Sequence, residues 1–196
     1  MSERLAFKVV IVGNGGVGKT SLIRRFVHDK FEKDYLLTIG TDVTKYSDQI
    51  EGNDITFIIW DLGGQEAFAE MRNKFFYGAN AAIVVFSHEE NEIGDTSFTS
   101  IPKWLGDISK FCGKIPTILF GNKIDLVDSE MLWSNDEHPR SDHALKKLAS
   151  DLGLLGYFKT SALSGKNVLT AFKTLMSKLY EFYKEQQNRP KRKMSF

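Results

Sequence analysis

The stretch GNGGVGKT, residues 13–20, follows directly on the apolar run FKVVIV, residues 7–12. This run has the length and the β-branched content of a buried strand, and the segment KTSLIRRFVHD, residues 19–29, carries apolar residues at helical spacing. The glycines therefore occupy a turn between a strand and a helix, which is where the phosphate-binding pattern G-x-x-x-x-G-K-[ST] is expected. Its fixed positions in this chain are Gly13, Gly18, Lys19 and Thr20.

A loop of this kind has a physical reason to bind phosphate. Glycines allow successive backbone N–H groups to face one anion, and the first turn of the following helix adds unpaired donors. The Lys19 ammonium would reach the β- and γ-phosphates, and the Thr20 hydroxyl is a candidate ligand of Mg²⁺. The alternative is a turn with an incidental lysine, which the spacing and the context together disfavour. The predicted phosphate-binding residues are Gly13, Asn14, Gly15, Gly16, Val17, Gly18, Lys19, Thr20 and Ser21.

The hexapeptide FGNKID, residues 120–125, predicts which base the nucleotide carries. It puts Asn122, Lys123 and Asp125 just beyond a buried strand. A carboxylate can accept two hydrogen bonds from guanine, at the ring N–H and at the exocyclic amine, whereas adenine has an acceptor at the ring position. A site built for both donors rejects adenine, because its carboxylate would be left unpaired. A polar turn would explain NKID alone, but its place downstream of a phosphate loop favours guanine.

The remaining pattern predicts one α/β domain, with a mostly parallel sheet of about six strands and helices on both faces. Strands are expected at residues 6–12, 44–50, 54–61, 81–87, 116–122 and 157–162, the second and third forming a hairpin around EGN. Helices are expected at residues 19–29, 97–112 and 167–186, and long loops at 88–96 and 127–140. We expect the domain to cover residues 1–187, followed by a flexible basic tail at 188–196.

Net charge, apolar runs and terminal motifs indicate which partners and which cellular location to expect. The chain of 196 residues has a formal net charge of +1, which predicts no general attraction to nucleic acid. No apolar run approaches the roughly 18 residues that a membrane-spanning helix needs. Neither Ser2 nor the C-terminal KMSF provides a lipidation motif. We therefore expect a monomeric cytoplasmic protein whose contact with membranes is peripheral, weak or indirect.

The residues that could carry other chemistry are few. Cys112 is the single cysteine, so no internal disulfide can form, and we expect it to pack near a helix end. The histidines lack the spacing of a metal site, and we expect them at solvated or helix-surface positions. They are His28, His88, His138 and His143.

Two further stretches complete a resemblance to a known family. DLGGQE, residues 61–66, matches the switch pattern D-x-x-G-Q-E, and TSA, residues 160–162, matches the last guanine-contacting loop. Over nearly its whole length, about Leu5 to Tyr183, the chain resembles a small GTPase of the Ras superfamily. YLLTIGTDV and IWDLGGQE are most similar to the Rab branch, while LGGQ is closer to Arf-like proteins. The resemblance implies the P-loop NTPase fold of small G proteins.

The resemblance also implies an activity and partners. The chain would bind GTP and GDP with Mg²⁺, hydrolyse GTP slowly without an activating protein, and act as a two-state switch in membrane traffic or signalling. Effectors, exchange factors and GTPase-activating proteins would bind through two switch loops. Val43 stands where Rab proteins carry an aromatic residue, and Leu163 replaces a common lysine. The alternative is a GTP-loaded adaptor with negligible turnover; a P-loop kinase is disfavoured by NKID.

At the phosphates, the resemblance assigns the following roles. Thr38 would ligate Mg²⁺ and sense the γ-phosphate, and Asp61 would hold the metal through water. The Gly64 amide would contact the γ-phosphate, and Gln65 would orient the attacking water. The expected catalytic residues are therefore Lys19, Thr38 and Gln65.

At the base, the resemblance implies that Phe31 stacks edgewise on guanine while Lys123 lies over the base and ribose. The Ala162 amide would meet the guanine oxygen. Ser161 and Leu163, on either side of Ala162, complete the expected nucleotide-binding set.

Overall fold

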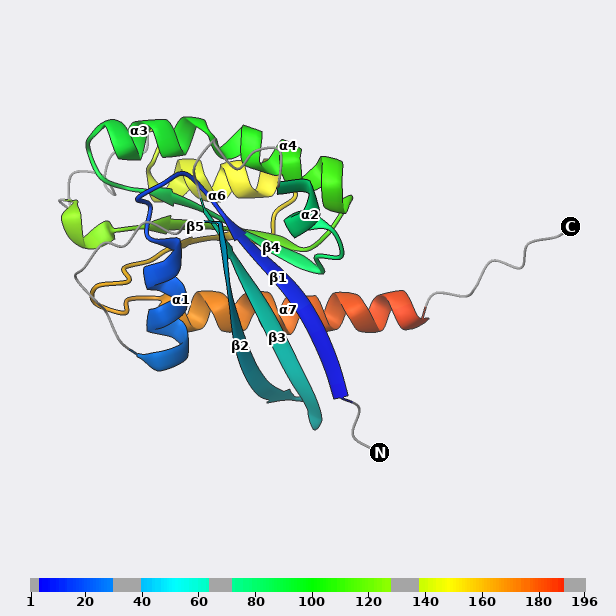
Figure 1. Cartoon of the computed structure of the whole chain (residues 1–196). Helices are drawn as coiled ribbons and strands as arrows, with labels where there is room; N and C mark the ends of the chain where they lie inside the picture. The colour runs from blue at the N-terminus through cyan, green and yellow to red at the C-terminus, as the bar shows by residue number, and fades with distance from the viewer. Residues whose placement is uncertain (1–3, 30–39, 64–71, 128–137, 189–196) are drawn as a thin grey trace, which may run out of the picture.

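The computed structural model describes residues 4–29, 40–63, 72–127 and 138–188. A six-stranded sheet runs through the molecule in the order β2-β3-β1-β4-β5-β6 (Figure 1). The strands are β1 Arg4–Val12, β2 Thr41–Ile50, β3 Asn53–Leu62, β4 Ala81–Ser87, β5 Thr117–Asn122 and β6 Tyr157–Lys159. The hairpin strands β2 and β3 pair antiparallel, and every other neighbouring pair is parallel. The predicted fold class is confirmed.

Helices cover both faces of the sheet. They are α1 Lys19–His28, α2 Arg72–Phe76, α3 Glu92–Thr99, α4 Ile101–Cys112, α6 Asp142–Asp151 and α7 Val168–Asn188, with a short 3₁₀ turn at Ile124–Leu126. Helices α1 and α7 lie on one side and α3, α4 and α6 on the other (Figure 1). None of the described helices combines the length and the apolarity that a bilayer crossing requires.

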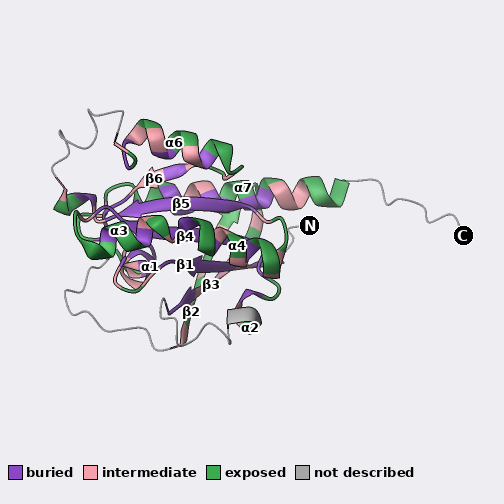
Figure 2. Ribbon diagram, turned by 90° about the horizontal axis from the view of Figure 1, so that it is seen from above, coloured by how far each residue is buried: buried purple, intermediate pink, exposed green. Residues whose placement is uncertain are grey.

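The central strand β4 shows why the sheet is covered on both sides. All seven of its residues are buried, as Figure 2 shows for the middle of the molecule. Ala81, Ile83 and Val85 belong to the core under α1 and α7, whereas Ala82, Val84 and Phe86 belong to the core under α4 and α6. A continuous apolar run is what a parallel strand between two helical layers needs.

Helix α7 packs along the first of these cores. The helix expected at residues 167–186 is confirmed, and its buried residues include Val168, Phe172, Leu175, Met176 and Leu179. The ring of Phe172 stacks on Phe26 of α1 at a centroid distance of 4.3 Å. Beyond Asn188 the expected tail lies outside the described residues.

Two expectations for the segment between β4 and β5 were wrong. Residues 92–96 are not loop but the first turns of α3, whose N-cap Asn91 accepts a hydrogen bond from the Gly94 N–H at 3.1 Å. An Asn cap followed by acidic residues in the first turn favours a helix start at this point. The expected helix at 97–112 is divided at Ser100, because α4 begins at Ile101 with Pro102 in its first turn.

Cys112 behaves as predicted. It is the last residue of α4, half-buried, and its thiol contacts the Phe76 carbonyl oxygen at 3.4 Å.

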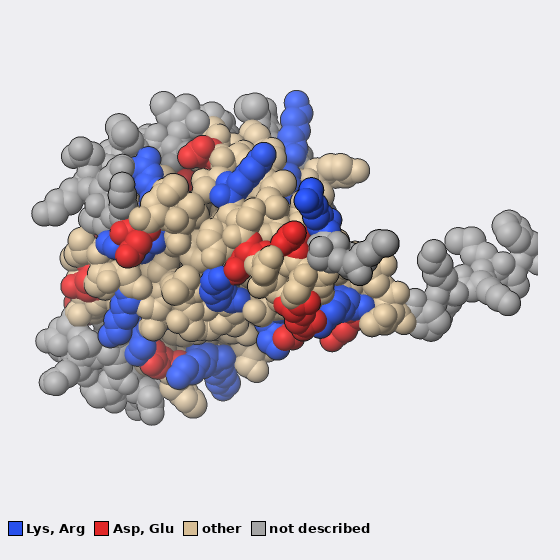
Figure 3. All heavy atoms as spheres, turned by 90° about the horizontal axis from the view of Figure 1, so that it is seen from below, with Lys and Arg blue, Asp and Glu red and all other residues tan. Residues whose placement is uncertain are grey.

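Basic and acidic side chains intermingle on the face seen in Figure 3. Two lysines of α7 form ion pairs. Lys173 pairs with Asp48, and Lys184 Nζ lies 2.7 Å from Glu51 Oε2.

Candidate functional site

The residues predicted to bind nucleotide meet at one edge of the sheet. The phosphate loop follows β1, Asp61 lies near the end of β3, Asn122 ends β5, and Ser161 follows β6. These four strands run in the same direction, so their carboxyl ends share an edge. Open α/β sheets bind their ligands in the crevice at this edge.

The phosphate loop depends on two glycines for different reasons. A Cβ at Gly13 would lie 2.2 Å from the Val85 carbonyl oxygen, so the loop passes directly against β4. A Cβ at Gly18 would lie 2.5 Å from Asn122 Nδ2, and its φ of +92° also disfavours a side chain. Gly15 differs from both, since nothing lies within 4 Å of a Cβ there.

Lys19 is buried inside the loop that it follows. Its side chain is 6% exposed, and Nζ donates to the carbonyl oxygens of Gly13 at 2.8 Å and Asn14 at 2.9 Å. Burial lowers the pKa of the Lys19 ammonium to about 8, and the Asp61 carboxylate acts in the opposite direction. A buried cation at the first residue of a helix is an electrostatic setting that favours a phosphate anion.

Thr20 and Asp61 form the second polar contact of the loop. The Thr20 hydroxyl donates to Asp61 Oδ2, and Asp61 is 2% exposed. A hydroxyl and a carboxylate are the oxygen ligands that Mg²⁺ accepts. Among the described residues no group of three or more His, Cys, Asp or Glu could hold a metal ion. The Thr20–Asp61 pair fits Mg²⁺ that is also bound by phosphate oxygens and waters.

Asn14 attaches the loop to the helical layer above it. Its Oδ1 accepts from the Trp104 indole N–H at 2.9 Å, and its Nδ2 donates to Ser100 Oγ at 3.2 Å. Trp104 is 4% exposed, so the anchor is part of the core under α4. The motif places Asn14 in the loop, but this anchor could not be predicted, because Trp104 lies 90 residues away in the chain.

Asn122 joins three segments of the site. Its Nδ2 donates to the Val17 carbonyl oxygen of the phosphate loop at 2.9 Å. Its Oδ1 accepts from the Ala162 N–H at 3.2 Å and from Thr160 Oγ1 at 3.3 Å. Since Asn122 is 1% exposed, the structure gives it the role of a clamp between the two loops.

The other residues of the base motif surround this clamp. Asp125 Oδ1 accepts from the Ser161 hydroxyl at 2.5 Å. The loop after β6 is also held by Arg25 of α1, which donates to the carbonyl oxygens of Ala162 at 2.8 Å and Leu163 at 2.6 Å. Arg25 was not identified from the sequence, because an arginine near the end of a helix has many ordinary roles.

Lys123 has a partner that the sequence did not suggest. Its Nζ lies 2.6 Å from Glu89 Oε2, and Glu89 follows β4 rather than β5. Arg140 in turn donates from Nη1 to the Glu89 carbonyl oxygen at 3.0 Å. The base motif is therefore connected to the segment after β4 and, through Glu89, to Arg140, two residues before α6.

His88 corrects the expectation that the histidines are solvated. It is completely buried, and Nε2 lies 2.7 Å from the Tyr157 hydroxyl. The ring lies over Gly121, where a Cβ would come within 2.3 Å of Nε2. His28 and His143 are exposed as expected, and His138 is half-buried.

Four of the predicted site residues lie outside the described residues: Phe31, Thr38, Gly64 and Gln65. Phe31 and Thr38 belong to residues 30–39, and Gly64 and Gln65 belong to residues 64–71. The described residues next to these two segments are hydrogen-bonded, since the Gly63 N–H donates to the Gly40 carbonyl oxygen at 2.9 Å. Leu163 is described and is 44% exposed.

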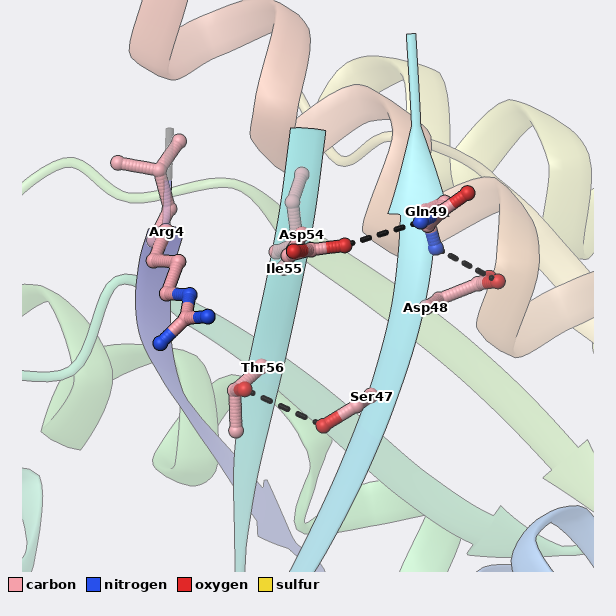
Figure 4. Close-up of a pocket in the computed structure, with 8 residues that line it drawn as sticks. Arg4, Ser47, Asp48, Gln49, Asp54, Ile55 and Thr56 are labelled. Atoms are coloured by element: carbon pink, nitrogen blue, oxygen red, sulfur yellow. Dashed lines mark hydrogen bonds between the residues drawn. The ribbon is translucent and has the colours of Figure 1, made fainter. Parts of the chain in front are cut away.

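A polar hollow lies at the opposite edge of the sheet. It is formed by the first residues of β1 and β3 and the last residues of β2, among them Arg4, Gln49 and Asp54 (Figure 4). Gln49 Nε2 donates to Asp54 Oδ1 at 3.0 Å, and the hydroxyls of Ser47 and Thr56 lie 3.2 Å apart. This hollow is at the amino ends of the parallel strands and contains none of the predicted nucleotide-binding residues.

Comparison with known proteins agrees with the geometry. The model of the Ras family matches residues 8–181. The chain is 30% identical to the GTP-binding protein YPT1 of Saccharomyces cerevisiae, over 92% of this chain and 82% of that protein. It is 35% identical to the Ras-related protein RABA4b of Arabidopsis thaliana, over 89% of this chain and 72% of that protein, and 32% identical to the Ras-related protein RIC1 of Oryza sativa, over 88% and 80%. The chain therefore belongs to the Ras family, as a Rab-like small GTPase.

Proposed function

We propose that the carboxyl edge of the sheet binds GTP and GDP with Mg²⁺, and that hydrolysis of GTP switches the protein between two states. The observation that carries the proposal is the Asn122 clamp, which binds the phosphate loop at Val17 and the loop after β6 at Ala162. One buried side chain thereby fixes the phosphate-binding half of the site relative to the base-binding half.

In the phosphate half, the amides of residues 13–21 and the Lys19 ammonium face the β- and γ-phosphates. Thr20 and Thr38 would ligate Mg²⁺, and Asp61 would hold it through water. When bound, Mg²⁺ neutralises charge on the phosphate oxygens. The contact between Thr20 and Asp61 supports this arrangement, because both oxygens already meet beside Lys19.

In the base half, Asp125 accepts from the guanine ring N–H and the exocyclic amine. The Ser161 hydroxyl bound to Asp125 supports this role, since it orients the carboxylate. The Ala162 amide meets the guanine oxygen, Lys123 lies over the base and ribose, and Phe31 stacks edgewise. We place Leu163, which follows Ala162 and is 44% exposed, at the rim of the base.

Hydrolysis needs a water held in line with the γ-phosphate more than it needs a base. We assign the orientation of that water to Gln65, with the Gly64 amide on the γ-phosphate. Turnover by the chain alone is slow, and a GTPase-activating protein accelerates it. Effectors and exchange factors recognise the segments around Thr38 and Gln65, whose flanking residues Gly40 and Gly63 are hydrogen-bonded.

The basic residues in 189–193 support weak contact of a monomeric, cytoplasmic protein with membranes. Arg189, Lys191, Arg192 and Lys193 would each contribute about 1 kcal/mol near an anionic surface, decreasing over a Debye length of about 8 Å at physiological salt. Vesicle sedimentation should show binding to anionic vesicles that is lost at physiological salt and on deletion of residues 188–196. Salt-resistant binding to neutral vesicles would contradict the proposal.

The function is tested by analysing the nucleotide that the purified protein holds after incubation with GTP and Mg²⁺. We expect conversion to GDP, and Mg²⁺ chelation should accelerate nucleotide release. A protein that retains GTP unchanged over many hours would instead be a GTP-loaded adaptor. A protein that retains ATP as readily as GTP would refute the base assignment.

A further inference from the structure

Glu89 forms an ion pair with Lys123, the lysine of the base motif. Its Oε2 lies 2.6 Å from Lys123 Nζ, and the side chains of Lys123 and Glu89 are 25% and 15% exposed. Lys123 has a φ of +63°, so its backbone is in the left-handed region just where the base motif leaves β5. The direction of the lysine is therefore set by its backbone at one end and by Glu89 at the other.

Glu89 is itself held by its neighbours. The Ser87 hydroxyl donates to Oε2 at 2.9 Å, beside the bond from Lys123. Burial alone would raise the pKa of the Glu89 carboxyl, but the hydrogen bonds from Lys123 and Ser87 outweigh it and lower the pKa. The carboxyl is therefore charged at neutral pH.

The Glu89 backbone is fixed by Arg140. Arg140 is 8% exposed, donates from Nη1 to the Glu89 carbonyl oxygen at 3.0 Å, and pairs through Nη2 with Asp95 Oδ1 at 2.9 Å. A Cβ at Gly94 would lie 1.8 Å from the same carbonyl oxygen, so α3 leaves no room for it to shift. The carboxylate thus extends from a constrained backbone.

We propose that Glu89 is a positioning residue that holds Lys123 in the orientation used against the guanine base and ribose, and that Arg140 holds Glu89. The proposal rests on the nucleotide site proposed above. A free lysine side chain loses rotamer freedom when it orders on a ligand, and one that is already oriented loses less. Glu89 should therefore slow the release of bound nucleotide.

The ordinary interpretation is an ion pair that only stabilises the fold. The two interpretations differ in how substitutions at Glu89 and Lys123 combine. If Glu89 acts through Lys123, its effect on nucleotide release must disappear once the lysine charge is removed. If Glu89 only stabilises the fold, its effect persists in that background.

The experiment measures the dissociation rate of a fluorescent GDP from the wild type, Glu89→Gln, Lys123→Met and the double variant, with Mg²⁺ present. Glu89→Gln keeps the size of the side chain and removes its charge, and we expect release to be about fivefold faster. Glu89→Asp retains the charge and should restore part of the difference. Glu90→Gln is the matched control, because Glu90 is the exposed neighbour, and it should release GDP at the wild-type rate.

In the Lys123→Met background, we expect Glu89→Gln to change release by less than about twofold. Arg140→Gln should accelerate GDP release less than Glu89→Gln does. Its effect should likewise disappear in the Lys123→Met background, because Arg140 acts on Lys123 through Glu89. Wild-type release from Glu89→Gln, slower release, or the full acceleration in the Lys123→Met background would each overturn the proposal. If Lys123→Met itself releases GDP at the wild-type rate, the base-site assignment of Lys123 fails first and the inference fails with it.

Discussion

The buried His88 makes the stability of the protein sensitive to acid in a way that one substitution can isolate. Burial, and to a smaller extent electrostatic repulsion from Arg140 and Lys159, lowers the pKa of the His88 imidazole to about 3. In the unfolded chain the imidazole takes up a proton below about pH 6.5. Between these two pH values the unfolded state binds one more proton, so the free energy of unfolding falls as the pH is lowered.

The magnitude follows from the linkage relation. From pH 7 to pH 5 an unfolded-state pKa of about 6.5 and a folded-state pKa well below 5 give a loss of about 2 kcal/mol from this group. His88→Gln removes the titration, and the amide can still hydrogen-bond with the Tyr157 hydroxyl. At pH 7 the variant should be less stable by about 1–2 kcal/mol, because the ring no longer packs on Phe86, whose centroid is 4.8 Å away.

The assay is urea unfolding of both proteins at pH 7, 6 and 5 with equal, saturating GDP and Mg²⁺. We expect the difference in unfolding free energy between wild type and His88→Gln to shift by about 2 kcal/mol in favour of the variant from pH 7 to pH 5. His143→Gln is the control, since His143 is exposed on α6, and its difference from wild type should not shift. If the difference in unfolding free energy between wild type and His88→Gln stays constant from pH 7 to pH 5, the imidazole is not held neutral in the folded protein.

Three further predictions concern the nucleotide site. Gln65→Leu should slow GTP hydrolysis at least tenfold while GTP affinity stays within about twofold, because leucine cannot orient the water; single-turnover hydrolysis measures this, and wild-type turnover would contradict the role. Gly18→Ala should abolish tight GDP binding, because the alanine Cβ would lie 2.5 Å from Asn122 Nδ2. Gly15→Ala should bind GDP normally, since nothing lies within 4 Å of a Cβ at that position. Equal GDP affinities of the two variants in a titration would contradict the geometry. Trp104→Phe should weaken GDP binding about fivefold through Asn14, because the indole N–H that fixes the loop is lost; calorimetry checks it, and unchanged affinity would show that the anchor is dispensable.

Much of the sheet could be predicted because its strands are continuous apolar runs between recognisable turns. The run AAIVVFS, residues 81–87, coincides with β4, and the hairpin turn at Glu51 and Gly52 lies where EGN indicated it. Boundaries were less accurate: β2 begins at Thr41 rather than at residue 44, and β6 ends at Lys159 rather than at residue 162. Partly exposed strand ends have no apolar signal, so their extent depends on pairing with a neighbour.

Helices that pack with few apolar residues were the harder part. Helix α6 was not predicted, although Ser141 caps it by accepting from the Ala144 N–H at 3.2 Å. Leu145 and Ala149 are its buried residues, too few for a clear periodic pattern. For α3, the Asn91 cap was the available signal, and the polar composition of the segment concealed it.

The positions of the motif residues could be predicted, but the side chains that hold them could not. Asn122 ends β5 and Lys123 follows it, at the strand end where the motif was expected. Glu89, however, lies 34 residues before Lys123, and Arg140 lies 51 residues after Glu89. Contacts of this kind depend on the order of strands in the sheet, which brings the ends of β4 and β5 together. A histidine after an apolar strand could equally be solvated, so the burial of His88 follows from Gly121 and Tyr157 and not from its own neighbours in sequence.

Recognition of guanine by Asp125 is tested by comparing GDP and xanthosine diphosphate binding to the wild type and to Asp125→Asn. The asparagine loses the charged acceptor of the guanine amine, and its amide can donate to the xanthine oxygen. We expect GDP affinity to fall at least about 100-fold and xanthosine diphosphate affinity to rise, so that the preference reverses. Equal GDP affinity in the two proteins, measured by titration with Mg²⁺ present, would contradict this role of Asp125.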